Sequence, residues 1–147
     1  MSDIRQSRFT DLDALTLYRI LRLREAVFAV EQNCVYSDLD GRDYEPGTEH
    51  LWIDGRPEAP TVAACVRLLV QPDGSRKLGR VATDAVERGR GLAGSLIDAA
   101  LGLVPEGTAT VLDAQVRLAP WYSRWGFERA GADFDEDGIR HTPMRRE

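Results

Sequence analysis

The segment from residue 86 to residue 101, VERGRGLAGSLIDAAL, limits the possible folds of this chain more than any other. Gly89, Gly91 and Gly94 follow the spacing G-x-G-x-x-G, and apolar residues recur behind them at helical intervals. The pattern predicts a glycine loop that opens a helix with a wide apolar face. A face this wide has to pack on a sheet. The segment therefore predicts an α/β protein in which a helix begins directly after a tight backbone turn.

Length, composition and charge narrow the class of protein further. The chain has 147 residues, 43% of them hydrophobic and 29% charged, which suits a single domain over residues 1–147. The formal net charge of −5 disfavours nucleic acid or an anionic membrane as a partner. No apolar run is long enough to span a bilayer, and the first residues lack the apolar core of a signal peptide. We therefore expect a cytoplasmic protein.

The two cysteines, Cys34 and Cys65, lie far apart in the sequence, and their spacing matches no metal site. In a cytoplasmic chain they are expected to be reduced thiols. The sequence therefore predicts no bound metal.

The sequence before the glycine loop predicts one helix and several strands. Ile4–Phe9 is expected to be extended, and Thr10 followed by Asp13 resembles a capping box that starts a helix. Arg24 lies within the apolar stripe of this helix, and we expect its charge to reach the edge of the stripe. Strands are expected over residues 50–54, 61–70 and 77–83, the first two as an antiparallel hairpin.

The sequence after the glycine-loop helix predicts a buried strand over residues 110–116. A short helix is expected from Ala119 to Gly126, where the glycine stops it. Two last extended pieces, near Phe127 and over Ile139–Met144, bracket a loop at residues 131–138. The order of elements predicts a mixed α/β fold whose first half is mainly antiparallel.

Three interpretations of the glycine loop are possible. The spacing occurs in dinucleotide-binding folds, and Asp113 lies far enough downstream to contact a ribose, which would suit a nicotinamide-dependent reductase. However, five residues separate the preceding strand from Gly89, and only one strand–helix–strand unit is recognisable. The loop could also be a simple turn with solvated arginines. We favour an anion site, because the first amides of a helix lack partners and Arg88 and Arg90 suit a pyrophosphate.

At this point the sequence resembles a known family. RGRGLA at residues 88–93 is similar to the R/Q-x-x-G-x-G/A signature of the GNAT acetyltransferases, and WYSRWGF at 121–127 resembles their aromatic-Tyr-x-x-x-Gly-Phe segment. Residues 20–43, 48–52 and 134–146 resemble the ElaA-like branch, so the similarity covers nearly the whole chain. The sequence departs mildly from the family pattern at Ala93, the third small residue of the loop, and from the ElaA-like branch at Ala29, where that branch more often has a bulkier apolar residue. The resemblance implies the GNAT (acyl-CoA N-acyltransferase) fold, an α/β fold with a mixed, largely antiparallel twisted sheet flanked by helices.

The resemblance also implies that the glycine loop holds the pyrophosphate of acetyl-CoA and that the preceding strand runs beside its pantetheine arm. Tyr122 is implied as the proton donor to the leaving thiolate, and a backbone N–H around Val81 as the donor to the oxyanion. The residues expected to bind the co-substrate are Val81, Ala82, Thr83, Arg88, Gly89, Arg90, Gly91, Leu92, Ala93, Gly94 and Ser95.

The general base is less clearly marked, with Glu31, His50, Asp84, His141 and water as candidates. We place Glu31 first, because it ends the first helix beside the acidic loop that borders the acceptor site in GNAT folds. The carboxylates of this region, Glu31, Asp38, Asp40, Asp43 and the 135–137 segment, can attract a cationic amine or form a solvated loop. The residues expected to bind the acceptor are Glu31, Tyr36, Asp38, His50, Trp52 and His141.

Together these features predict an acetyl-CoA-dependent N-acetyltransferase that moves the acetyl group directly to a primary amine on a small molecule or peptide. The alternative is a non-catalytic protein of the same fold that senses acyl-CoA. The identity of the amine and the oligomeric state, with a homodimer among the alternatives, are not set by the sequence.

Overall fold

The structure is a computed structural model that describes residues 3–33, 37–58 and 61–147. Its first elements are β1 (Ile4–Ser7), the 3₁₀ turn η1 (Phe9–Asp11), α1 (Ala14–Arg24), the π-helix η2 (Glu25–Glu31), β2 (Glu49–Asp54), β3 (Val62–Val70) and β4 (Arg76–Thr83). They are followed by η3 (Ala85–Glu87), α2 (Leu92–Gly102), β5 (Thr110–Gln115), η4 (Val116–Leu118), α3 (Ala119–Tyr122), η5 (Ser123–Trp125), β6 (Glu128–Arg129), β7 (Phe134–Glu136) and β8 (Ile139–Arg146).

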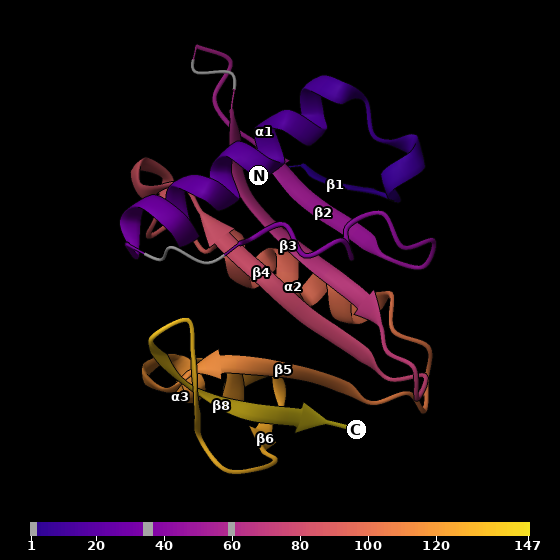
Figure 1. The fold of residues 1–147 in the computed structure, drawn as a ribbon. Coiled ribbons are helices and arrows are strands. Elements are labelled where there is room, and N and C mark those ends of the chain that lie inside the picture. The colour runs from indigo at the N-terminus through magenta and orange to yellow at the C-terminus, as the bar shows by residue number, and fades with distance from the viewer. Residues whose placement is uncertain (1–2, 34–36, 59–60) are drawn as a thin grey trace.

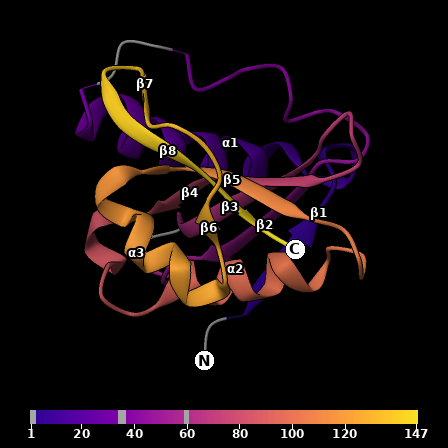
Figure 2. The same cartoon turned by 90° about the horizontal axis from the view of Figure 1, so that it is seen from below.

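The strands form one sheet with the order β1-β2-β3-β4-β5-β8-β6, and β7 pairs with β8 (Figure 1). Among the described strands, only the neighbours β4 and β5 run parallel. The helix α1 covers one face of the sheet, and α2 and α3 lie on the other (Figure 2). The predicted α/β fold, with its mixed and largely antiparallel sheet, is confirmed.

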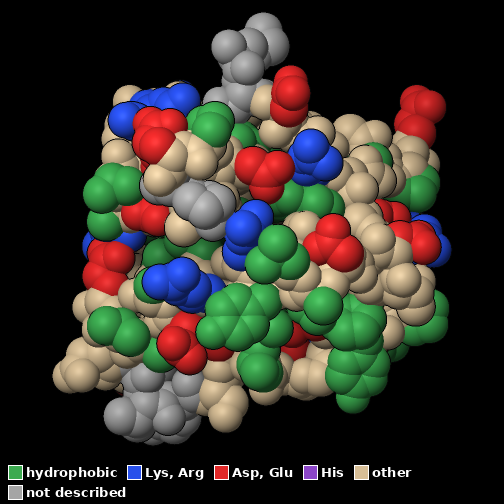
Figure 3. All heavy atoms as spheres, turned by 90° about the horizontal axis from the view of Figure 1, so that it is seen from above, with side chains coloured by type: hydrophobic (Ala, Val, Ile, Leu, Met, Phe, Trp, Pro, Cys, Tyr) green, Lys and Arg blue, Asp and Glu red, His purple; other side chains and the backbone are tan. Residues whose placement is uncertain are grey.

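Each face of the sheet has its own hydrophobic cluster. Under α2, side chains such as Leu96 and Ile97 are fully buried against the sheet, as the wide apolar stripe of that helix predicts. Under α1, Ile20 and Leu23 pack on the opposite face. On the face seen from above, acidic and basic side chains are interspersed (Figure 3).

The sheet opens between β4 and β5. These strands pair only at their first residues, Arg76 with Thr110 and Lys77 with Val111. Beyond Lys77 they separate towards their C-terminal ends (Figure 1). The edge of β4 that faces β5 therefore has no strand partner over most of its length, which leaves backbone N–H and C=O groups available to a ligand.

A β-bulge lies in the same part of β4. Cys65 pairs with Ala82 and Arg67 pairs with Gly79, so two steps along β3 match three steps along β4. The extra residue is accommodated at Arg80, whose φ of 50° lies in the left-handed region. A non-glycine residue in this region costs on the order of 1 kcal/mol unless its surroundings hold it there.

The bulge changes which face of the sheet the side chains of β4 point to. Leu78 packs in the cluster under α2, whereas Ala82, four residues later, packs in the cluster under α1. Residues four apart in a regular strand face the same side, so the extra residue at Arg80 accounts for the change.

Two local predictions were wrong. Thr10 does not cap the first helix, because Leu12 is extended (ψ 134°) and interrupts it. Asp13 is the cap instead, and its carboxylate accepts from the Thr16 N–H at 2.7 Å. The predicted loop at residues 131–138 contains the strand β7, which pairs with β8.

Candidate active site

The glycine loop has the geometry of an open helix start. Gly89 and Gly91 have φ values of 85° and 73°, a backbone conformation that favours glycine. A Cβ atom added at either position would meet no atom within 4 Å. Gly91 is the N-cap of α2, and the Ser95 N–H donates to its carbonyl at 3.1 Å. The amides of residues 92–94 therefore have no acceptor within the helix and can bind an anion.

The two arginines of the loop are held at its surface by carboxylates. Arg88 makes a bidentate ion pair with Glu31, with N···O distances of 2.6 and 2.7 Å, and Arg90 pairs with Glu87. The side chains of Arg88 and Glu31 are 43% and 46% exposed. Exposed pairs of this kind contribute little stability, so a phosphate can replace the carboxylate as the partner of Arg88.

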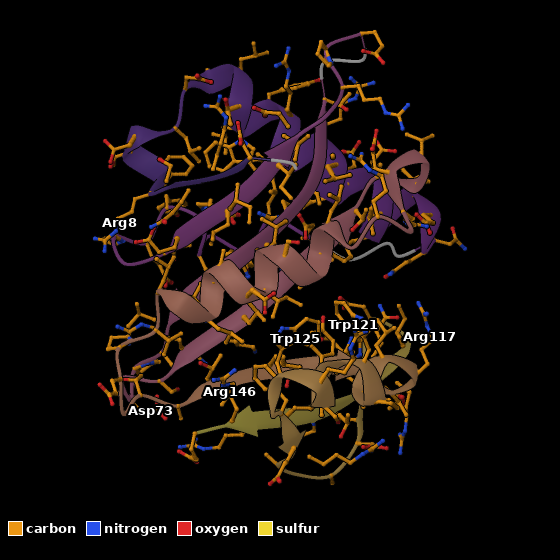
Figure 4. The ribbon with its side chains drawn as sticks, turned by 180° about the vertical axis from the view of Figure 1, so that it is seen from behind. Arg8, Asp73, Arg117, Trp121, Trp125 and Arg146 are labelled. Atoms are coloured by element: carbon orange, nitrogen blue, oxygen red, sulfur yellow. The ribbon has the colours of Figure 1, made fainter. Side chains whose placement is uncertain are left out.

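The third glycine of the loop, Gly94, lies where α2 packs against the segment that follows α3. A Cβ at Gly94 would come 3.5 Å from the Trp125 ring, and the Trp125 Nε1–H donates to Asp98 at 2.7 Å. Trp121 contacts the rings of Trp125 and Tyr122 edge to face. Trp121, Trp125 and Arg117 lie along the border of the β5–α3 region that faces α2 (Figure 4). The glycine-loop helix is thus linked by packing to the segment that carries Tyr122.

A cleft of about 500 Å³ lies where β4 and β5 separate. Its walls include residues of η2, the 37–42 loop, β3, β4, β5, α3 and the β7–β8 turn. The predicted site residues that line it are Val81, Asp38, Tyr122 and His141. The structure thus brings a predicted co-substrate-binding residue, two predicted acceptor-binding residues and a predicted catalytic residue into a single cavity.

Tyr122 is a buried phenol in the wall of this cleft, only 7% exposed. Its ring contacts Trp121 and Phe127 edge to face. Burial raises the pKa of Tyr122 to about 12. The hydroxyl therefore keeps its proton throughout the neutral pH range and can donate a hydrogen bond within the cleft.

His141 lines the same cleft and has a defined tautomer. Its Nδ1 atom lies 2.8 Å from the carbonyl oxygen of Ile139; because a carbonyl only accepts, Nδ1 carries the proton in the neutral ring. Nε2 lies 3.7 Å from a carboxylate oxygen of Glu136, and Phe134 stacks on the ring. The neutral imidazole therefore has its lone pair on Nε2.

Glu31 lies apart from the cleft. It lines a separate hollow of about 280 Å³ between α1 and the end of β4, together with Asp84. The hydrogen bond from Arg88 lowers the pKa of Glu31, which makes this carboxylate a weaker base. Asp84 accepts from the Val86 N–H at 3.1 Å and so caps η3.

Two further predicted residues are part of the protein interior. His50 in β2 is 2% exposed, its Nε2–H donates to the Asp43 carbonyl at 2.9 Å, and burial lowers its pKa. Trp52 packs in the cluster under α1. Neither residue is among those that line the cleft. Tyr36 lies outside the described residues.

The acidic loop forms a buried ion-pair network. Asp43 receives hydrogen bonds from Arg24 at 2.7 Å and from Arg67 at 3.1 Å. Burial alone would raise the pKa of Asp43, but the two guanidinium groups together lower it. Arg24 is 1% exposed, so the expectation that its charge reaches the surface was wrong, because carboxylates far along the chain come to it.

The other carboxylates of the loop are also paired. Asp38 lies 2.8 Å from Arg24 and 2.7 Å from Arg80, and Asp40 lies 2.8 Å from Arg67 and 3.3 Å from Arg80. With Asp43, three carboxylates are matched by three arginines. The loop therefore does not present the surplus of negative charge that its sequence indicates.

Several cleft residues were missed from the sequence. Lys77 and Asp113 form an ion pair of 2.9 Å across β4 and β5, and Arg67 and Arg80 line the cleft beside them. The available signal was the occurrence of basic residues inside the otherwise apolar strands TVAACVRLLV and KLGRVAT.

The described residues also bear on metal binding, membrane crossing and cysteine reactivity. Within residues 3–33, 37–58 and 61–147, no cluster of three or more His, Cys, Asp or Glu side chains is arranged to hold a metal ion. In the same part of the chain, no helix combines the length and apolar character that crossing a membrane requires. Burial raises the pKa of Cys65 to about 12, so its thiol remains protonated and unreactive.

Comparison with known proteins defines the class. Residues 62–147 match the family model of the acetyltransferase (GNAT) domain. The chain belongs to this family, and its fold is that of the acyl-CoA N-acyltransferases.

Particular relatives narrow the position within the family. The chain is 42% identical over 139 residues to the UPF0039 protein Rv2851c of Mycobacterium tuberculosis, which covers 92% of this chain and 87% of the relative. The crystal structure of an acyl-CoA N-acyltransferase from Pseudomonas aeruginosa matches with a TM-score of 0.92 at 36% identity, and that of Escherichia coli ElaA with 0.90 at 30%. Both matches cover 100% of each chain. The resemblance to the ElaA-like branch is confirmed.

Proposed function

We propose that this protein is an acetyl-CoA-dependent N-acetyltransferase that moves the acetyl group directly to a primary amine. The observation that carries the proposal is the cleft beside the open edge of β4, which contains Tyr122 and follows the same strand that leads into the glycine loop. A phosphate site and a site for acyl transfer are thereby connected by one strand. The acceptor is a small molecule or a peptide.

The described residues fit coenzyme A. The amides at the start of α2 and the side chains of Arg88 and Arg90 provide donors for a diphosphate. A Cβ atom at Gly89 or Gly91, the left-handed glycines before these amides, would meet open space. The unpaired edge of β4 offers backbone groups to the amide-containing pantetheine arm, in the way that a strand edge accepts an extended partner.

The reaction has a simple balance. The nitrogen lone pair of the acceptor attacks the thioester carbonyl carbon, a C–N bond forms, the C–S bond breaks, and the amine loses one proton. An alkylamine with a pKa of about 10 is mostly protonated at neutral pH. The ammonium therefore first releases one proton to solvent, and the nitrogen loses a second proton to the base after the attack. Negative charge develops first on the carbonyl oxygen and then on sulfur. A backbone N–H of β4 around Val81 is the proposed donor to that oxygen.

Tyr122 is proposed as the donor to the leaving sulfur. A thiol has a pKa of about 8.5, whereas that of Tyr122 is raised to about 12. Full proton transfer from the phenol is therefore unfavourable, and Tyr122 acts by donating a hydrogen bond that stabilises the thiolate. The thiolate takes its proton from solvent on release.

His141 is proposed as the base, in preference to Glu31. Its Nε2 lone pair is available in the cleft, 3.7 Å from a carboxylate oxygen of Glu136. The other charged or titratable groups that line this part of the cleft are Asp137, Arg117 and Tyr122. We expect His141→Gln to lower kcat while the Kd of acetyl-CoA changes little. Turnover at the wild-type rate in the variant would assign the proton to water.

The direct test is calorimetric titration with acetyl-CoA, followed by thiol-release assays with polyamines, amino acids and short peptides. We expect micromolar or tighter binding and thiol release with at least one amine. Binding without release from any amine would favour a non-catalytic acyl-CoA sensor. Thermal protection by NAD(H) and none by coenzyme A would favour a reductase.

Tyr122→Phe tests the role of the phenol as hydrogen-bond donor to the leaving sulfur. We expect kcat to fall about 100-fold, a typical contribution of a positioned proton or hydrogen-bond donor, while the Kd of acetyl-CoA changes little. Tyr18→Phe is the matched control, because Tyr18 lies on α1 and is 68% exposed. Equal turnover of the Tyr122 variant and the control would remove Tyr122 from the mechanism.

A further inference from the structure

The acidic loop is not explained by attraction of an amine, because its carboxylates are matched by arginines. Two of them converge on Arg80, the residue at the bulge of β4. The Arg80 Nε atom lies 2.7 Å from Asp38, and its Nη2 atom lies 3.3 Å from Asp40. Nη2 also donates to the backbone carbonyl of Asp38 at 3.0 Å. The guanidinium is thus held by three oxygens of one loop.

The backbone of Arg80 is held as well. Its carbonyl accepts a weak hydrogen bond from the Cys65 thiol at 3.7 Å. Its φ of 50° is a conformation that side chains other than glycine rarely adopt. Both the side chain and the main chain of Arg80 are therefore held, and a left-handed conformation of this kind persists only where the surroundings determine it.

The loop that holds Arg80 is itself anchored. Asp38 also pairs with Arg24 of α1, which is 1% exposed, and Asp40 also pairs with Arg67 of β3. Through these ion pairs, the bulge is connected to the buried C-terminal end of α1 and to the neighbouring strand β3. A free surface loop could not restrain a backbone dihedral angle in this way.

The bulge decides which groups face the cleft. One residue more or less in a strand moves every following side chain to the opposite face. Loss of the left-handed conformation at Arg80 would therefore change the orientation of Val81, which lines the cleft next to Tyr122, and of the backbone groups around it.

We infer that Asp38 and Asp40, through Arg80, are positioning residues that hold the β4 bulge in the shape required for acyl transfer. The inference rests on the proposed function for its effect on catalysis, but the restraint on the backbone is independent of it. The acidic loop thereby acts on the reacting region through the backbone shape of β4.

Two substitutions at residue 80 separate backbone positioning from charge. Arg80→Ala removes the guanidinium and keeps the penalty for positive φ, whereas Arg80→Gly removes the guanidinium and also the penalty. With acetyl-CoA and the amine that the wild-type protein acetylates fastest, we expect kcat to fall at least tenfold in Arg80→Ala. In Arg80→Gly it should stay within about threefold of the wild type, with KM for acetyl-CoA nearly unchanged in both.

Arg8→Ala is the matched control, because Arg8 forms an exposed pair with Glu49 of 2.9 Å at a distant strand (Figure 4). It should leave kcat unchanged. Equal losses in the glycine and alanine variants would mean that Arg80 acts through its charge, and would overturn the inference. Unchanged kcat in Arg80→Ala would overturn it as well.

A measurement that needs no catalytic turnover tests the restraint on the bulge separately from the proposed function. Amide hydrogen exchange at residues 79–83 should be at least tenfold faster in Asp40→Asn than in the wild type, and unchanged in Glu49→Gln. Exchange at wild-type rates in Asp40→Asn would contradict the restraint. If no amine supports thiol release, the proposed function fails, and the exchange rates still decide whether the loop holds the bulge.

Discussion

Two sets of arginine–carboxylate pairs, one in the glycine loop and one in the acidic loop, differ in exposure. In the glycine loop, Arg88 and Glu31 are 43% and 46% exposed. In the acidic loop, the side chains of Arg24 and Asp43 are 1% and 9% exposed. The chemistry of these two pairs is the same, but the Arg88–Glu31 pair is exposed to water and the Arg24–Asp43 pair is buried.

The difference separates a site that can accept a ligand from one that supports the structure. An exposed pair contributes about 0–1 kcal/mol and can change partners. Removing one partner of a buried pair leaves an uncompensated charge and costs about 3–5 kcal/mol. Arg88 of the glycine loop is therefore available to a phosphate, whereas Arg24 and Arg67, the buried arginines paired with the acidic loop, are committed to the fold.

The largest expected effect is on stability. Asp43→Asn should lower the free energy of unfolding by about 3 kcal/mol, because two buried guanidinium groups lose their carboxylate. Glu31→Gln, the exposed counterpart, should change it by less than about 1 kcal/mol. Urea unfolding of both variants measures the contrast, and equal losses would remove the distinction between the two sets.

Acid should act mainly on the buried set. The arginines hold the pKa values of Asp40 and Asp43 below those of an unfolded chain. Their contribution is therefore present above about pH 4, the unfolded pKa, and is lost as the pH falls towards the folded values. We expect a loss on the order of 2 kcal/mol between pH 5 and pH 2. Asp43→Asn should flatten this profile in thermal unfolding; an unchanged slope would argue against the network as its source.

Charge reversal in the exposed set should affect binding instead. Arg88→Glu or Arg90→Glu should raise the Kd of acetyl-CoA at least tenfold, or about 1.4 kcal/mol, because the diphosphate loses a cation and meets an anion. Calorimetry measures the change, with stability at neutral pH as the control. An unaltered Kd in both variants would mean that the loop does not hold the phosphates.

The smallest expected effect tests whether Glu31 and a phosphate compete for Arg88. If Glu31 occupies Arg88 until a phosphate replaces it, Glu31→Gln should tighten acetyl-CoA binding two- to threefold, or about 0.5 kcal/mol. Weaker binding in this variant would instead make Glu31 a support that orients Arg88 for the ligand. Titration in parallel with the wild type, at low and high salt, distinguishes these outcomes.

Local patterns were sufficient for much of the fold. The glycine loop and the helix behind it were predicted because left-handed glycines and a period of 3.6 residues are written into a short segment. The strands flanking the loop were predicted from apolar runs bounded by turn residues. Of the candidate site, Tyr122 and Val81 were identified through a resemblance to a family, and both line the cleft.

Features that depend on distant partners were not predicted. Arg24 is joined to carboxylates 14 and 19 positions along the chain, and no local pattern shows such a pairing. The strand β7 escaped detection because FDE has low strand propensity, and with it the contact between Glu136 and His141. The bulge at Arg80 depends on the register with β3, which is a tertiary property.

The most direct test of the account is a crystal structure with acetyl-CoA bound. The account predicts the diphosphate within hydrogen-bonding distance of the amides at the start of α2, with the pantetheine arm between β4 and β5. A cofactor lodged elsewhere, or a start of α2 closed by packing, would contradict it.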